Sequence, residues 1–136
     1  MYSPMLASLL DAPLVDPELV YEPKYDGIRA IAEVLVGGRV RLWSRLGNEK
    51  TRQFPEIAEA LGDWARTRDA PVVLDGEIVA LDAKGHPVSF QGLQGRIHLG
   101  GIPHRGAGPG TRDPGLGARK HDQPKSAAAF IAFDVL

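Results

Sequence analysis

The sequence contains no cysteine, which excludes disulfide bonds and thiolate metal sites and is typical of a reducing compartment. It also lacks an apolar run near the roughly 20 residues that span a bilayer, and it does not start with a basic and then an apolar segment. Sixteen basic and seventeen acidic residues leave a net charge of −1, so the whole chain has no electrostatic preference for nucleic acid or membrane. The four histidines show no zinc-ligand spacing. These absences favour a cytoplasmic protein without a membrane partner.

The stretch Glu22-Pro23-Lys24-Tyr25-Asp26-Gly27-Ile28-Arg29 is the most informative part of the 136 residues, whose length and 43% hydrophobic content predict one globular domain. A lysine attacks phosphorus or carbonyl carbon only as the neutral amine, so a catalytic lysine needs burial or a nearby cation, which Arg29 could supply. Asp26-Gly27 is a hairpin turn signal that would place Lys24 at a strand end. A strand, a turn and a strand with solvated charges fit the same spacing.

Hydrophobic periodicity predicts an α+β fold with largely antiparallel strands in a twisted sheet. Gly37-Gly38 favours a turn with positive φ between two strands, and Pro55 suits the first turn of a helix that buries Ile57, Leu61, Trp64 and Ala65. A weak short helix is expected over residues 90–97. The expected strands cover residues 19–22, 28–36, 39–43, 72–81 and 127–136.

Two carboxylates, Asp75 and Glu77, lie inside the most apolar of these strands. Period 2 places both on one face, and Gly76 between them indicates close approach by a ligand or another backbone. An edge strand with a solvent-facing acidic pair is equally compatible with this pattern. In the final strand, the same period places Phe133 and Asp134 on opposite sides.

Two segments do not follow these patterns. Residues 99–125 are rich in glycine and proline and more basic than acidic, which predicts a flexible insertion that either touches a phosphate backbone or has no role. Residues 1–13 are apolar and contain two prolines. We expect them to pack over the sheet edge, with a short helical turn at residues 5–10.

Together these stretches resemble the nucleotidyltransferase family of ATP-dependent DNA ligases, and the resemblance covers almost the whole chain. The family's pattern Glu-x-Lys-x-Asp-Gly-x-Arg is matched from Glu22 to Arg29. Its later elements follow in the family's order as Ser44-Arg45-Leu46-Gly47, Phe54-Pro55-Glu56, Leu74-Asp75-Gly76-Glu77-Ile78 and Phe133-Asp134. The start of the chain and residues 89–96 look most like the bacterial ligase D branch.

The resemblance implies an ATP-grasp-like adenylation domain in which Lys24 forms a covalent lysyl-AMP. AMP would then pass to the 5′-phosphate of nicked double-stranded DNA, and the 3′-OH would seal the backbone in DNA repair or recombination. In the family's manner, Arg29 and Arg45 would bind phosphate or ribose oxygens, Phe133 would stack on adenine and Glu22 would lie beside the base. Glu77 would hold the ribose hydroxyl or Mg²⁺, and Asp26 would help to bind metal.

The family's later parts are not in this sequence, namely a Glu-Gly strand motif, a Lys-x-Lys motif and an OB-fold domain. The expectation is therefore residues 1–136 as a C-terminally incomplete adenylation domain that alone seals nicks poorly or not at all. Missing ligase regions, or a repair polymerase or nuclease domain, would be its partners. Two alternatives stay open: an RNA ligase or capping-type enzyme, and a noncatalytic remnant that binds nucleotide or nicked DNA.

Overall fold

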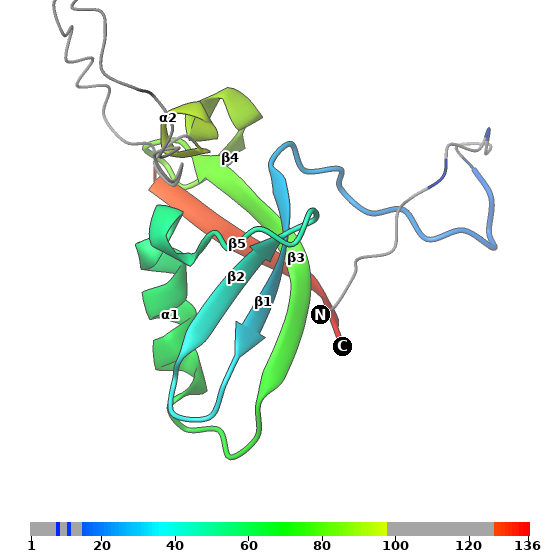
Figure 1. Cartoon of the computed structure of the whole chain (residues 1–136). Helices are drawn as coiled ribbons and strands as arrows, with labels where there is room; N and C mark the ends of the chain where they lie inside the picture. Colours follow the sequence, from blue (N-terminus) through cyan, green and yellow to red (C-terminus); the bar gives the residue numbers. More distant parts are fainter. Residues whose placement is uncertain (1–7, 9–10, 12–14, 98–126) are drawn as a thin grey trace, which may run out of the picture.

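The computed structural model describes residues 8, 11, 15–97 and 127–136 (Figure 1). Its five-stranded sheet has the order β2-β1-β3-β4, with β5 also paired to β3, and every pairing is antiparallel. The strands are β1 (Ile28–Val34), β2 (Val40–Ser44), β3 (Val72–Leu81), β4 (Pro87–Val88) and β5 (Ala127–Val135). The predicted α+β class is confirmed, whereas the predictions for residues 1–13 and 99–125 lie outside the described residues, apart from 8 and 11.

The β1–β2 hairpin turns at two glycines, as predicted. Gly37 and Gly38 have φ values of 85° and 82°, a region that side-chain-bearing residues rarely adopt. The turn rests on the helix that follows, because a Cβ atom added to Gly62 would lie 2.6 Å from the carbonyl oxygen of Gly38. The hairpin and the helix therefore approach each other backbone to backbone.

After the short η1 helix (Thr51–Gln53), α1 (Pro55–Ala65) begins with the predicted proline in its first turn. Ile57 and Ala65 are buried, and Leu61 packs against the same core. The prediction that Trp64 is a core residue is wrong, since it is 43% exposed. Trp64 lies at the margin of the helical stripe, and its ring stacks with Arg68, whose Cζ is 3.9 Å from the ring centroid.

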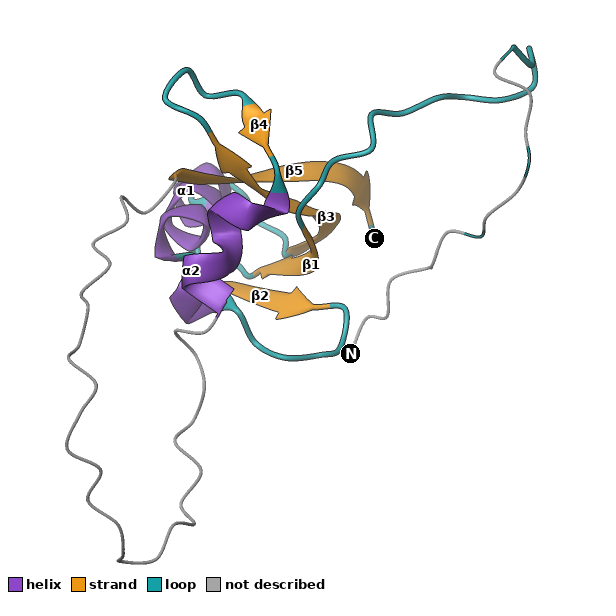
Figure 2. Cartoon of the chain, turned by 90° about the horizontal axis from the view of Figure 1, so that it is seen from above, coloured by secondary structure: helices purple, strands orange, loops and turns teal. Residues whose placement is uncertain are grey.

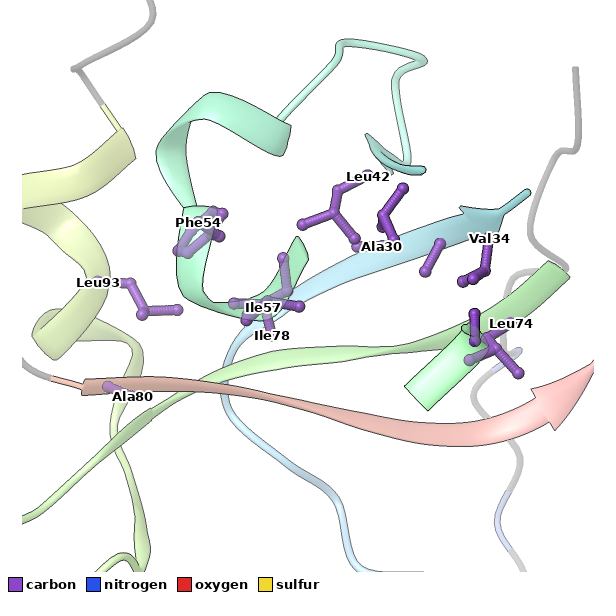
Figure 3. Close-up of a cluster of buried hydrophobic side chains, with 12 residues drawn as sticks. Ala30, Val34, Leu42, Phe54, Ile57, Leu74, Ile78, Ala80 and Leu93 are labelled. Carbon is purple, nitrogen blue, oxygen red and sulfur yellow. The ribbon is translucent and has the colours of Figure 1, made fainter. Parts of the chain in front are cut away.

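The hydrophobic core lies between α1 and one face of the sheet (Figure 3). Phe54, Leu42, Ile78 and Leu93 are each fully buried there. Leu93 comes from η2 (Phe90–Leu93), which continues into α2 (Gln94–Ile97), and an ion pair between Arg96 and Glu56 links α2 to α1. Figure 2 shows α1 and α2 next to each other. One face of the sheet is thus covered by helices, which leaves the other face for a site.

β3 is the central strand rather than an edge strand. It pairs with β1 over residues 72–78 and with β5 over residues 74–81, so both of its edges are hydrogen-bonded. The alternative of an edge strand with a solvent-facing acidic pair is therefore wrong. No helix in the described part of the chain is long and apolar enough to cross a membrane.

Candidate active site

The lysine segment reaches the sheet as irregular chain. The predicted strand over residues 19–22 is wrong: residues 19–26 have no regular structure, and Pro17 and Pro23, which bracket the strand prediction, each lack the N–H that a ladder needs. Asp26-Gly27 is not a hairpin turn either, because Gly27 is not among the glycines with positive φ. Gly27 instead crosses β3 closely, and a Cβ atom added there would lie 2.1 Å from the carbonyl oxygen of Ile78. This crossing fixes Lys24 beside β3.

The face of the sheet opposite the core carries Arg29, Asp75 and Glu77. Arg29 of β1 lies directly across from Glu77 of β3, and Ile31 lies across from Asp75. Residues directly opposite each other in a ladder point to the same face, so the predicted common face of Asp75 and Glu77 is confirmed. Leu74, Ile78 and Ala80 point to the other face, where they belong to the core.

A β-bulge places Phe133 on this same face. Asp134 pairs with Asp75, but Ala132 pairs with Gly76, which leaves Phe133 without a partner in the β3–β5 ladder. One extra residue breaks the period of 2, so the prediction that Phe133 and Asp134 face opposite sides is wrong. Asp134 shares the face of Asp75, and Phe133 lies over Arg29, whose Cζ is 5.1 Å from the ring centroid.

Arg29, Glu77 and Phe133 line a cavity of about 420 Å³ together with the lysine segment. Lys24 and Glu22 are exposed at it, while Glu77 and Arg29 are half-buried. The structure thus brings together, from the irregular segment and three strands, most of the residues predicted from the sequence, although their roles stay predictions. The lining consists of Glu22, Pro23, Lys24, Tyr25, Arg29, Glu77 and Phe133.

Arg29 is held by a carboxylate that was not predicted to have a role. Its Nε and Nη2 atoms donate hydrogen bonds to Oδ1 and Oδ2 of Asp75 at 3.0 and 2.7 Å. This is the paired geometry in which a guanidinium fork matches a carboxylate. The hydrogen bond to Asp75 is the main cause that raises the pKa of Arg29, against the opposing effect of burial. Arg29 therefore stays a cation in the cavity wall.

Glu77 lies in an environment that opposes its charge. Burial raises the pKa of Glu77, and the nearby carboxylate of Asp26 acts in the same direction. A hydrogen bond from the Gly27 backbone and the charges of Arg29 and Lys24 favour the ionised form, but they do not outweigh the burial. A cation bound in the cavity would stabilise the ionised carboxylate.

Asp26, predicted as a metal ligand, lies just outside this cavity lining. Its Oδ2 accepts a hydrogen bond of 3.1 Å from the backbone N–H of Phe90, which ties the lysine segment to the start of η2. Across the described ranges, no three histidine, cysteine, aspartate or glutamate side chains gather as a metal site. A metal held here would need oxygen ligands from a bound phosphate as well.

Arg45 lines a second cavity, of about 470 Å³, that meets the first at Arg29. It sits in a turn after β2, where the N–H of Gly47 donates to the carbonyl oxygen of Ser44 at 2.8 Å, as the sequence predicts. The basic side chain of Lys50 also lines this cavity, although no sequence motif pointed to Lys50. The second cavity is lined by Ile28, Arg29, Ser44, Arg45, Leu46, Asn48 and Lys50.

This is an α+β domain whose antiparallel sheet gathers a lysine, a carboxylate and an aromatic ring around one cavity. These features are typical of a nucleotidyltransferase-like domain. Residues 4–136 match the model of a family described as "ATP dependent DNA ligase domain". The chain belongs to this family, which confirms the resemblance drawn from the motifs.

Named relatives agree with this assignment. DNA ligase C of Mycobacterium tuberculosis is 36% identical over 134 residues, which is 98% of this chain and 31% of that protein. The multifunctional non-homologous end joining protein LigD of Pseudomonas aeruginosa is 39% identical over 98 residues, which is 72% of this chain and 11% of that protein. The chain spans less than a third of either relative.

Solved structures show the same fold. The ligase domain of Mycobacterium tuberculosis LigD superimposes with a TM-score of 0.53 at 33% identity, over 85% of this chain and 28% of that one. A mycobacterial DNA ligase D complexed with ATP and MES gives the same TM-score and identity. The predicted ligase D branch is thus represented among the similar proteins, together with DNA ligase C.

Proposed function

We propose that this chain carries out the adenylation step of an ATP-dependent DNA ligase, with Lys24 as the nucleophile. The observation that carries the proposal is the single cavity shared by Lys24, Glu77 and Phe133. An amine, an oxygen ligand and an aromatic ring are the groups needed to attack a phosphorus atom, hold a ribose or metal, and stack on a base. The ATP-complexed ligase D among the similar structures supports ATP as the substrate.

The chemical step is a phosphoryl transfer. The neutral Nζ of Lys24 attacks the α-phosphorus of ATP, a P–N bond forms, and the P–O bond to the β-phosphate breaks. Pyrophosphate leaves with the bonding electron pair, and the amine proton passes to water. Such a reaction needs in-line positioning and cations near the developing charge more than it needs an acid or a base. Arg29 supplies one fixed cation in the cavity wall.

The remaining cavity residues orient the nucleotide. Phe133, a residue that is 44% exposed, stacks on adenine, and Glu22 lies beside the base. Glu77 accepts a hydrogen bond from the ribose hydroxyl or holds Mg²⁺. Each of these residues reaches the cavity from a different part of the chain, so the nucleotide-binding site exists only when the sheet is folded.

Mg²⁺ fits this donor set. The ion prefers oxygen ligands and is often held by one or two carboxylates together with substrate phosphates. Glu77, whose pKa is raised by burial, and the neighbouring Asp26 are the described carboxylates that would hold it. When bound, the ion neutralises charge on the phosphates.

The later steps extend the proposal to nicked double-stranded DNA. The activated AMP passes to a 5′-phosphate, and Arg45 and Lys50 line the neighbouring cavity where a further phosphate can bind. Four relatives are named for non-homologous end joining, which supports a role in DNA repair or recombination. The longer relatives also support further ligase or repair regions as partners.

The test is incubation with Mg²⁺ and ATP labelled at the α-phosphate, followed by denaturing gels. The wild-type chain should acquire covalent label, and Lys24→Ala should acquire none. Lys84→Ala, which removes an exposed lysine from a turn outside the site, is the matched control and should label like the wild type.

Two other results would contradict the proposal. Label from GTP but not from ATP would favour a capping-type enzyme. Salt-dependent binding of nicked duplex without any lysine adduct would favour a noncatalytic module.

A further inference from the structure

Asp75 is the only buried acidic residue in the part of the chain that the structure describes, with 4% of its surface exposed. Burying a carboxylate is costly unless it is paired, and here both of its oxygens accept hydrogen bonds from Arg29. Asp75 faces away from the hydrophobic core and towards the cavity side of the sheet. A buried ion pair often adds little net stability compared with apolar residues of the same volume. Stability alone therefore does not explain this pair, and we look for its role in the adjacent site.

The pair decides which edge of the guanidinium is available to a ligand. Asp75 takes the Nε–H and one N–H of Nη2, so that both N–H groups of Nη1 and the second one of Nη2 remain as donors. The guanidinium also lies over Phe133, with Cζ 5.1 Å from the ring centroid. Its plane and its free edge are thereby fixed with respect to the cavity.

We infer that Asp75 is a positioning residue for nucleotide binding, acting through Arg29. By occupying one edge of the guanidinium, Asp75 turns the other edge towards a phosphate or ribose oxygen in the lysine cavity. Without Asp75, the long arginine side chain would sample several rotamers and lose part of its binding energy to ordering. This inference rests on the proposed function.

A double-variant cycle tests the inference. Equilibrium ATP binding and the rate of adduct formation are measured for the wild type, Asp75→Asn, Arg29→Gln and the double variant, together with thermal unfolding. Asp75→Asn should weaken ATP binding about 10- to 100-fold, the size expected for loss of a charge-assisted hydrogen bond. In the Arg29→Gln background, Asp75→Asn should change binding less than about 2-fold, because the group on which it acts is gone.

Two further variants sharpen the result. Glu33→Gln removes another carboxylate from the same face of β1, away from the cavity lining, and should bind ATP like the wild type. Arg29→Lys keeps the charge next to Asp75 but cannot form the paired hydrogen bonds. It should reproduce the loss of affinity even where Asp75→Asn fails to fold.

The outcomes are distinct. Wild-type affinity in Asp75→Asn, or in Arg29→Lys, overturns the inference. An equal loss on adding Asp75→Asn with and without Arg29 also overturns it, because Asp75 would then act independently. A wild-type chain that neither binds ATP nor forms an adduct overturns the proposed function, and this inference with it.

Discussion

At the scale of single residues, the carboxylates of Asp75 and Glu77 differ in how their negative charge is compensated. Asp75 is more buried, but its charge is matched by Arg29 at 2.7 Å. Among the described residues, Glu77 has no such ion-pair partner: burial raises its pKa, and Asp26 adds to the effect. A carboxylate with the proposed role of binding a cation is expected to lower the stability of the unliganded chain in this way.

Glu77→Gln should therefore stabilise the unliganded chain at pH 7, by at most about 1 kcal/mol because the group is only half-buried. The folded chain holds the Glu77 proton more tightly than the unfolded chain, whose pKa is near 4.5. This contribution to stability is present at low pH and is lost as pH rises through the raised folded-state pKa.

Denaturant unfolding at pH 7 and near pH 3.5 checks the sign. The difference between Glu77→Gln and the wild type should be largest at pH 7 and should vanish at the lower pH. Glu59→Gln, at an exposed position on α1, should show no comparable pH dependence. A variant that is less stable than the wild type at pH 7 would contradict this reading of Glu77.

At the scale of elements, the site depends on close crossings of backbone at glycines. Gly27 lets the lysine segment cross β3, and Gly76 lets Phe130 of β5 pack directly over β3, where an added Cβ would lie 2.5 Å from the ring. Next to Gly76, the bulge in β5 turns Phe133 into the cavity. The glycines of both motifs thus serve packing geometry rather than turns.

Gly27→Ala should displace the lysine segment from β3, because the new methyl group would meet a backbone carbonyl that cannot move aside. We expect stability to fall by about 1–3 kcal/mol. The rate of adduct formation should also fall, by about 100-fold, since a misplacement of 1 Å can cost that much.

Gly95→Ala is the matched control, because an added Cβ there meets nothing within 4 Å. Thermal unfolding and single-turnover adenylation measured on both variants check the prediction. Normal adduct formation by Gly27→Ala would show that the crossing does not position Lys24.

At the scale of the whole molecule, the hydrophobic core and the residues of the proposed active site lie on opposite faces of one sheet. The face towards α1 carries the buried cluster that includes Phe54, Ile57 and Leu93, and the other face carries Arg29 and Glu77. Because side chains alternate along β1 and β3, successive residues point in turn to the core and to the proposed site. Core substitutions should therefore alter stability with little direct effect on the cavity.

Phe54→Ala should cost about 3–5 kcal/mol of unfolding free energy, because the ring is fully buried between α1 and the sheet. Trp64→Ala removes a larger ring but should cost less than about 1.5 kcal/mol, because Trp64 is 43% exposed. Denaturant unfolding of the two variants compares them directly. A larger cost for Trp64 would restore the sequence-based prediction that it belongs to the core.

The sequence predicted what depends on neighbouring residues. The Gly37-Gly38 turn, the helix starting at Pro55 and the alternation in β3 follow from local conformational preference and short-range periodicity, and the structure confirms each of them. The strand expected at residues 19–22 failed because an extended run becomes a strand only where a partner pairs with it.

The amino-acid sequence by itself determined helix α1, the strands β1, β2, β3 and β5, the order of the motifs and the family. Only the tertiary structure decided that Asp75 pairs with Arg29, 46 positions away, and that the bulge places Phe133 beside them. The physical reason is that hydrophobic periodicity and conformational propensity depend only on residues close together in the chain. The partner of a charge and the register of a ladder are instead set by which distant strands meet.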